Sequence, residues 1–412
     1  MLKPEQHHGQ ALTLTMLVAA GLVNFLDRSS LSIALNSIRA EMHLSATQIG
    51  GLIAAFSLAY GFSQLPVGPL LDRFGAWRIV GAGLGVWSLA QLFTGFVTGV
   101  RGFLPMRVLL GMGEAPFFPG AVKLVRERFT VEERGRAMGA VNISSAIGQG
   151  LAPPLLTAIM LWLGWRSMFM LIGGIGTALA VLWFAVQRFT APAAAPAPEV
   201  PARLSFENWL SLFGQRSMWG MMLGFGGINY TAWFYIAWLP AYLQDERGVS
   251  VLHSGWLAAL PFLGGSAGMY VSGLLADIRI GRGREHRFVH MSQIVSGMVF
   301  SALFTLAAPH VAGLGGAVAC MSSALFCIHF AGTSAWGYVH SASDRTMVAT
   351  VGSIQNFGSF LIASVAPFAT GRILDLTHAY GSAFALCAAV SLAGAACYLF
   401  VVRQRTVVLA QA

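Results

Sequence analysis

Four charged side chains interrupt apolar stretches of this sequence, and their chemistry needs an explanation. Asp27 and Arg28 stand in "VNFLDRSSLS", and Arg107 and Glu114 stand in "RVLLGMGEAPFFPG". Each such charge costs about 2.5–3.5 kcal/mol at the centre of a helix in lipid. The two acids and two bases sum to zero charge, which indicates mutual pairing. Structural pairing alone is one interpretation, and the binding of an anion together with proton transfer is the other.

The spacing of these residues predicts which of them meet. On a helix that starts near residue 12, Asp27 lies about 22 Å from the start, and Arg107 lies about 8 Å along an oppositely directed helix. In an apolar layer about 30 Å thick the two depths coincide, so we expect Asp27 to pair with Arg107. Arg28 points about 100° away from Asp27 and is expected to face a cavity, where its guanidinium binds a carboxylate. Glu114 is expected near the midplane, without another fixed partner, as a proton carrier.

The elements that carry these residues are long apolar segments. The chain has 412 residues, of which 56% are hydrophobic and 10% are charged, whereas soluble domains have roughly 25% charged residues. A helix needs about 20 apolar residues to cross a bilayer, and only helices or closed barrels can cross. We therefore predict an all-α membrane protein with twelve transmembrane helices, at residues 12–35, 47–70, 78–99, 102–125, 136–160, 167–187, 217–243, 253–275, 290–308, 313–338, 347–370 and 382–402.

The basic residues predict the orientation of these helices. If the N-terminus lies inside, eighteen lysines and arginines fall in inner loops and five in outer loops, which is the positive-inside bias. Both termini are therefore expected in the cytoplasm, and the net charge of +9 implies no nucleic-acid partner. The sequence has no phosphate-binding loop with a lysine and no paired nucleophile and base. We expect neither an ATP-driven pump nor an enzyme, and no metal or cofactor.

A linker divides the chain into two halves of six helices each. The Ala/Pro-rich stretch "TAPAAAPAPEVPARLS" has the composition of a semi-rigid spacer. We predict an N-terminal half at residues 1–188, a cytoplasmic linker at 189–216 and a C-terminal half at 217–412. Paired halves are typical of transporters that bind their substrate at the midplane between the halves.

A short motif recurs in a loop of each half. Gly68, Asp72 and Arg73 follow the second predicted helix, and Gly273 and Asp277 follow the eighth with the same spacing. This pattern resembles the signature loop of the major facilitator superfamily, Gly-x-x-x-Asp-Arg-x-Gly, and the resemblance covers the whole chain. It implies that these residues form a gate on the cytoplasmic side as the halves rock. A solvated turn with basic residues is the simpler alternative.

Several further stretches narrow the resemblance to one branch of that superfamily. "FLDRSSLSIA", "RVLLGMGEAPFFPG", "GWRSMF", "AWLPAYLQDERGVS" and "LPFLGGSAG" together resemble the anion:cation symporter family, which includes bacterial hexuronate and aldonate transporters. The resemblance implies that Arg28 binds substrate and that Asp27, Glu114 and Arg107 take part in proton coupling. "GQGLAPPL" lacks the Gly-Pro-x-x-Gly-Gly pattern of proton-linked drug antiporters, which favours symport.

Polar side chains on other helices are candidates for contacts with substrate hydroxyls. By family position we expect Tyr60, Gln149, Trp336 and Asn356 to bind substrate, although a hydrogen bond between helices is the alternative for each. His329 is a further candidate, either for substrate or proton contact or as a core histidine. One departure from the family is Phe25, where many sugar-acid transporters have a tyrosine nearby.

These expectations together describe one function. We predict a secondary active transporter, monomeric in the bacterial inner membrane, that imports a small sugar-acid-like carboxylate with protons by alternating access. Its partners would be the organic anion, protons and the lipid bilayer. Uptake of an aromatic or dicarboxylic acid, or efflux of an organic anion, remains the alternative, because the sequence does not identify the anion.

Overall fold

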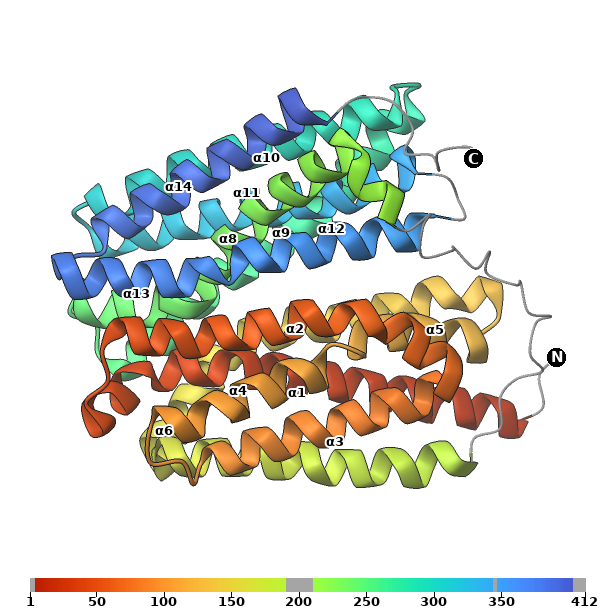
Figure 1. Ribbon diagram of the computed structural model, residues 1–412, viewed down its shortest axis with the longest axis horizontal. Helices are drawn as coiled ribbons and strands as arrows, with labels where there is room; N and C mark the ends of the chain where they lie inside the picture. Colours follow the sequence, from red (N-terminus) through yellow and green to blue (C-terminus); the bar gives the residue numbers. More distant parts are fainter. Residues whose placement is uncertain (1–3, 190–209, 344–346, 403–412) are drawn as a thin grey trace. The chain divides into compact units, whose positions relative to one another are not determined.

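The computed structural model describes residues 4–189, 210–343 and 347–402, and its regular elements are helices (Figure 1). The all-α fold predicted from the sequence is therefore confirmed. The chain groups into two compact units, one comprising Met1–Leu44 and Ala55–Glu199 and the other Ser45–Ala54 and Val200–Ala412. Most of the predicted linker, residues 190–209, lies outside the described residues.

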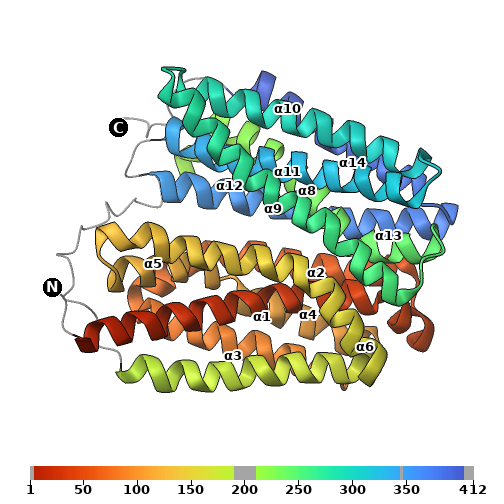
Figure 2. The same ribbon diagram turned by 180° about the vertical axis from the view of Figure 1, so that it is seen from behind.

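The first unit is a bundle in which one very long helix supports several others. It contains α1 (Pro4–Met42), the larger part of α2 (Ala46–Phe74), α3 (Ala76–Thr94), α4 (Val100–Glu114), α5 (Phe117–Arg128) and α6 (Val131–Phe189). The helix α6 packs against both α1 and α3 (Figure 2). It consists of two helical stretches that meet at Gly164, where a φ of 80° interrupts the helix. The predicted spans at 136–160 and 167–187 correspond to these two stretches.

The second unit contains the remaining helices and the first residues of α2. Its helices are α8 (Arg216–Asp245), α9 (Val251–Gly281), α10 (His286–Ala307), α11 (Leu314–Ala342), α12 (Val348–Ala363), α13 (Val365–Thr377) and α14 (Gly381–Ala396). Within the described residues of both units, nine helical segments are long and apolar enough to cross a membrane. The count of twelve spans and the cytoplasmic termini stay predictions.

The repeated motif lies at the ends of two helices, so its prediction as a loop is wrong. Gly68 and Asp72 are within the last turns of α2, and Gly273 and Asp277 are within α9. The first of these helices ends only where Gly75 adopts a φ of 85°, a left-handed conformation that commonly terminates a helix. The sequence pattern failed here because a helix can continue beyond the apolar residues that cross the lipid.

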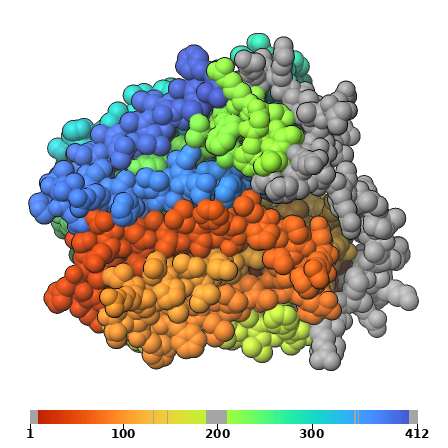
Figure 3. Space-filling view, in the orientation of Figure 1, coloured from red at the N-terminus to blue at the C-terminus, as the bar shows by residue number. Residues whose placement is uncertain are grey.

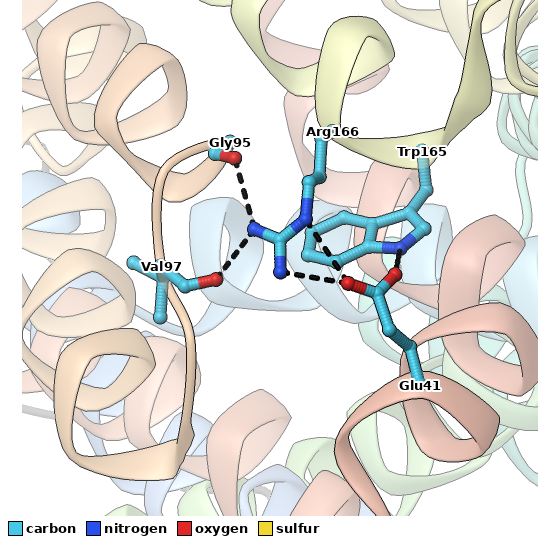
Figure 4. A network of polar contacts seen from close by, with 5 residues as sticks. All are labelled: Glu41, Gly95, Val97, Trp165 and Arg166. Atoms are coloured by element: carbon cyan, nitrogen blue, oxygen red, sulfur yellow. Dashed lines mark hydrogen bonds and ion pairs between the residues drawn. The ribbon is translucent and has the colours of Figure 1, made fainter.

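A polar network ties the C-terminal end of α1 to the middle of α6 (Figure 4). The Glu41 carboxylate accepts a hydrogen bond from Trp165 Nε1 at 2.6 Å and two from Arg166, from Nε at 3.1 Å and from Nη2 at 2.8 Å. Arg166 Nη1 also donates to the carbonyls of Gly95 and Val97, at 3.1 and 2.6 Å. The "GWRSMF" stretch therefore joins α1, α6 and the turn after α3, directly beside the break at residue 164.

The first residues of α2 pack against α13 within the second unit (Figure 3). Asp375 accepts hydrogen bonds from the backbone N–H groups of Ala46 and Thr47, each at 2.9 Å, and from Thr47 Oγ1 at 2.5 Å. A carboxylate at a helix N-terminus satisfies free N–H groups and interacts favourably with the helix dipole. The backbones approach closely, since a Cβ added at Gly371 would lie 2.2 Å from the Ala46 carbonyl oxygen.

This close approach generates a stability prediction. We expect Gly371→Ala to destabilise the protein by about 1–3 kcal/mol, because the added methyl group must push the two backbones apart. Thermal unfolding of the purified protein measures the change. Gly273→Ala is the matched control, because a Cβ there meets no atom within 4 Å and alanine favours a helix interior. Equal unfolding temperatures for the two variants would contradict the close packing.

Candidate functional site

The centre of the first unit contains a buried ion pair between α1 and α4. Arg28 Nε donates to Glu114 Oε2 at 2.7 Å. The Glu114 side chain is fully buried, whereas the Arg28 side chain keeps 11% of its surface exposed. A buried charge is strongly unfavourable without its partner. The contact therefore links α1 to α4, and Arg28 is the less buried member of the pair.

The pairing predicted from the sequence is found only in part. Asp27 and Arg107 attract each other but form no ion pair within 4 Å among the described residues. Glu114 has the partner that it was expected to lack. Because Arg28 and Glu114 lie side by side, Arg107, seven residues earlier on α4, is displaced along the helix by about 10 Å. Its Nη2 donates to Gln91 Oε1 at 3.2 Å instead. The depth estimate failed because it placed both helices by assumed starting residues, whereas the observed contact between Arg28 and Glu114 defines their relative register.

The Asp27 carboxyl group is buried with few polar contacts, which is unusual for this side chain. It is fully buried, and neither oxygen has a hydrogen bond of good geometry in the part of the chain that the structure describes, although the carboxyl group interacts with Trp87 and Arg107. Asn24 lies one turn earlier on the same face of α1. Its side-chain amide is also fully buried and lacks hydrogen bonds of good geometry. The amide nevertheless interacts with Glu114. Buried polar groups without partners are rare and call for an explanation such as a proton or a water molecule. Sequence reasoning missed Asn24, although its spacing of three from Asp27 was a usable signal.

Aromatic rings enclose the Arg28 guanidinium. Its central carbon lies 4.9 Å from the ring centre of Tyr60, 5.5 Å from that of Phe25 and 5.7 Å from that of Phe56. These distances are within the range of cation–π attraction. Tyr60, a predicted substrate residue, therefore lies beside Arg28, as the prediction requires. Its role in substrate binding stays a prediction.

One predicted gate residue of the first unit, Asp72, contacts α5. Lys123 Nζ donates to Asp72 Oδ1 at 2.5 Å and to the Leu71 carbonyl at 3.0 Å, so that it caps the end of α2. Arg73 lies over the ring of Phe74 at 5.3 Å, and Gly68 is exposed. Their role as a gate stays a prediction.

The remaining predicted residues are more dispersed. Gln149 lies on α6 in the first unit and is half-buried. In the second unit, Trp336 on α11 is 41% exposed and meets the ring of Phe225 edge-on, and Asn356 on α12 is half-buried. Their contacts with substrate stay predictions.

Two polar residues of the second unit have roles that the structure describes in part. His329 Nδ1 bonds the Leu325 carbonyl at 2.9 Å, one turn earlier on the same helix, which fits the core-histidine interpretation. Asp277, the counterpart of Asp72, is exposed at the end of α9, and its role as a gate residue stays a prediction.

Comparisons with known proteins agree with this architecture. A family model described as the Major Facilitator Superfamily matches residues 17–367. A probable L-galactonate transporter of Escherichia coli K12 is 48% identical over 96% of this chain and 90% of its own length. A D-galactonate transporter of Escherichia coli O6:H1 is 30% identical over 95% of both chains. A hexuronate transporter of Bacillus subtilis is 30% identical over 90% of this chain and 89% of its own.

Solved structures support the fold. A bacterial homologue of the human lysosomal transporter Spinster, in an inward-facing and unoccupied conformation, matches with a TM-score of 0.76 at 19% identity, over 98% of this chain and 96% of that one. A D-xylose–proton symporter matches with a TM-score of 0.73 at 13% identity, over 97% of this chain and 99% of that one.

The buried ion pair generates a testable prediction about stability. Arg28→Met leaves Glu114 without its partner and should destabilise the protein by about 3–5 kcal/mol. The double variant Arg28→Met/Glu114→Gln should recover much of that loss, because no uncompensated charge remains. Thermal unfolding of the purified variants measures both. The exposed Lys123–Asp72 pair is the control, since Asp72→Asn should cost only about 0–1 kcal/mol. Strictly additive losses at residues 28 and 114 would show that the two side chains do not interact.

Proposed function

Because the chain belongs to the major facilitator superfamily and is a multi-pass membrane transporter rather than an enzyme, we propose that it imports a sugar acid together with protons. The observation that carries the proposal is the contact between Arg28, the less buried member of the pair, and the fully buried Glu114. The similar transporters named for galactonate and hexuronate support a substrate with one carboxylate and several hydroxyl groups.

The ion pair couples the proton to the substrate by competition for one cation. While Glu114 is ionised, it holds the Nε edge of the Arg28 guanidinium. Protonation of Glu114 removes the negative charge from this contact and frees Arg28 for the substrate carboxylate, which fits the guanidinium fork. Release of the proton restores the internal pair and displaces the substrate. The proton thus changes the relative stability of the bound and unbound states, as a coupled transport cycle requires.

Membrane energetics favour more than one proton for each substrate. Moving an anion inward against a negative-inside potential is opposed by about 2.3 kcal/mol per charge per 100 mV. One proton cancels that opposition, and a second turns the potential into a driving force. Asp27 and Glu114 are two buried carboxylates on facing helices, which supports two proton sites.

The remaining predicted residues complete the proposal. Tyr60 and Gln149 would bind substrate hydroxyls from the first unit, and Trp336 and Asn356 from the second. Asp72 would form part of a gate on the cytoplasmic side, together with the motif residues Gly68, Arg73 and Asp277. We propose that the protein works as a monomer in the bacterial inner membrane.

The role of Glu114 is tested by a variant that imitates its protonated form. In proteoliposomes, Glu114→Gln should lose accumulation of galactonate driven by a pH gradient or a potential, and it should retain galactonate-for-galactonate exchange. The matched control is Glu132→Gln, an exposed glutamate at the start of α6, which should keep both activities. Wild-type accumulation by Glu114→Gln under an imposed proton gradient would refute proton coupling at Glu114.

The role of Arg28 is tested by a variant that keeps its charge. Arg28→Lys retains the cation but loses the planar fork that binds a carboxylate through two parallel hydrogen bonds. We expect the affinity for galactonate to fall more than tenfold, an effect of about 1.4 kcal/mol or more, as measured by calorimetry on purified protein. Near-normal affinity would exclude Arg28 as the carboxylate ligand.

A further inference from the structure

Three aromatic rings surround Arg28, and the most deeply buried phenylalanine among them is Phe56. Phe56 is 3% exposed, and its ring centre lies 5.7 Å from the guanidinium carbon. The ring of Phe56 is stacked on that of Tyr60, with centres 6.1 Å apart and an interplanar angle of 27°. Phe25, one turn before Arg28 on α1, supplies the third ring at 5.5 Å. We call these three residues the aromatic box.

The backbone brings the aromatic box and Glu114 to the same place. Gly111 precedes Glu114 by three residues on α4, and a Cβ added there would lie 2.5 Å from the Phe56 carbonyl oxygen and 2.9 Å from the Tyr60 nitrogen. Only a glycine permits this contact between the two helices. The helix that supplies the carboxylate is thus pressed against the turn of α2 that supplies two of the rings.

The ion pair by itself does not satisfy the arginine. Glu114 engages Nε, whereas Nη2 is buried and has no hydrogen-bond partner in the described structure. Ring faces attract a cation without using its N–H groups. The two phenylalanine rings of the box therefore stabilise the charge of Arg28 without occupying its N–H groups, whereas the Tyr60 side chain also interacts with Arg28 as a hydrogen-bond partner.

We propose that Phe56 is a positioning residue that holds the Arg28 guanidinium in place while its anionic partner changes from Glu114 to the substrate carboxylate. The inference rests on the proposed function. An arginine released by Glu114 would otherwise be free to leave the position in which it meets the substrate carboxylate. The fixed rings oppose that movement, because leaving them forfeits the cation–π attraction. Phe56 acts only through Arg28, because it is buried and offers no group to a ligand.

The sharpest test changes the electrostatics of the ring without changing its shape. Phenylalanine with one, two or three fluorine atoms is introduced at position 56, which weakens the negative ring face stepwise. Galactonate affinity should fall stepwise with each fluorine and reach about a tenfold loss with three, within the range of a desolvated cation–π contact. The same series at Phe103, a fully buried ring stacked on Trp165, is the matched control and should leave affinity unchanged.

A second measurement needs no substrate and keeps the inference testable on its own. Trifluorophenylalanine at position 56 should lower the unfolding temperature of the ligand-free protein. It should have no such effect in the Arg28→Met/Glu114→Gln background, where the cation is absent. A flat response to fluorination in both assays would overturn the positioning role of Phe56, whatever the fate of the proposed function.

The two proposals fail in different ways. If Arg28→Lys binds galactonate normally, Arg28 does not bind the substrate carboxylate and that part of the proposed function is wrong. If Arg28→Lys loses affinity but fluorination at position 56 has no effect on affinity or on stability, Arg28 binds the substrate and the aromatic box only fills space.

Discussion

Two opposite charges lie in a part of the first unit that water scarcely reaches, and each is tolerable only while the other stays in contact. Glu114 is fully buried and Arg28 nearly so, in helices whose surroundings are apolar. Since removing either partner exposes the other to the full desolvation penalty, this pair sets the register of α1 against α4. The positions of Asp27, Asn24 and Arg107 follow from that register. Their unusual environments are consequences of the one contact.

Contacts elsewhere in the first unit help to keep that ion pair in place. Glu41 and Arg166 tie the far end of α1 to α6, and Gly111 lets α4 approach α2 until the backbones touch. A transport site needs such support, because a small error in the position of a charged group costs much of its effect. Contacts of this kind are common between packed helices, whereas charges buried in an apolar interior are rare.

Composition and motif spacing predicted the helical membrane fold, the superfamily and the four charged residues of the site. The pairing within that site was not predictable, because it depends on the relative register of two helices to within a turn. Counting from assumed helix starts placed Asp27 opposite Arg107, whereas the observed contact between Arg28 and Glu114 defines the relative register of the two helices. Asn24 was overlooked although its spacing of three from Asp27 places both side chains on one face of α1. The cap that Asp375 provides for α2 joins residues more than 300 positions apart, and no local signal marks such a contact.

The two buried carboxylates have different surroundings, and this has a consequence for the proposed cycle. On the proposed mechanism, Glu114 contacts the cation that the substrate needs, so a proton on Glu114 changes the availability of Arg28. Asp27 has no hydrogen bond of good geometry in the described structure, although it interacts with Trp87 and Arg107. Under the same mechanism, a proton on Asp27 therefore changes the net charge of the site without releasing Arg28. On the proposed mechanism, Glu114 therefore links the proton to substrate binding, while Asp27 adjusts how much charge crosses the membrane with each cycle. Two carboxylates on facing helices can thus divide between them the affinity for the substrate and the response to the membrane potential.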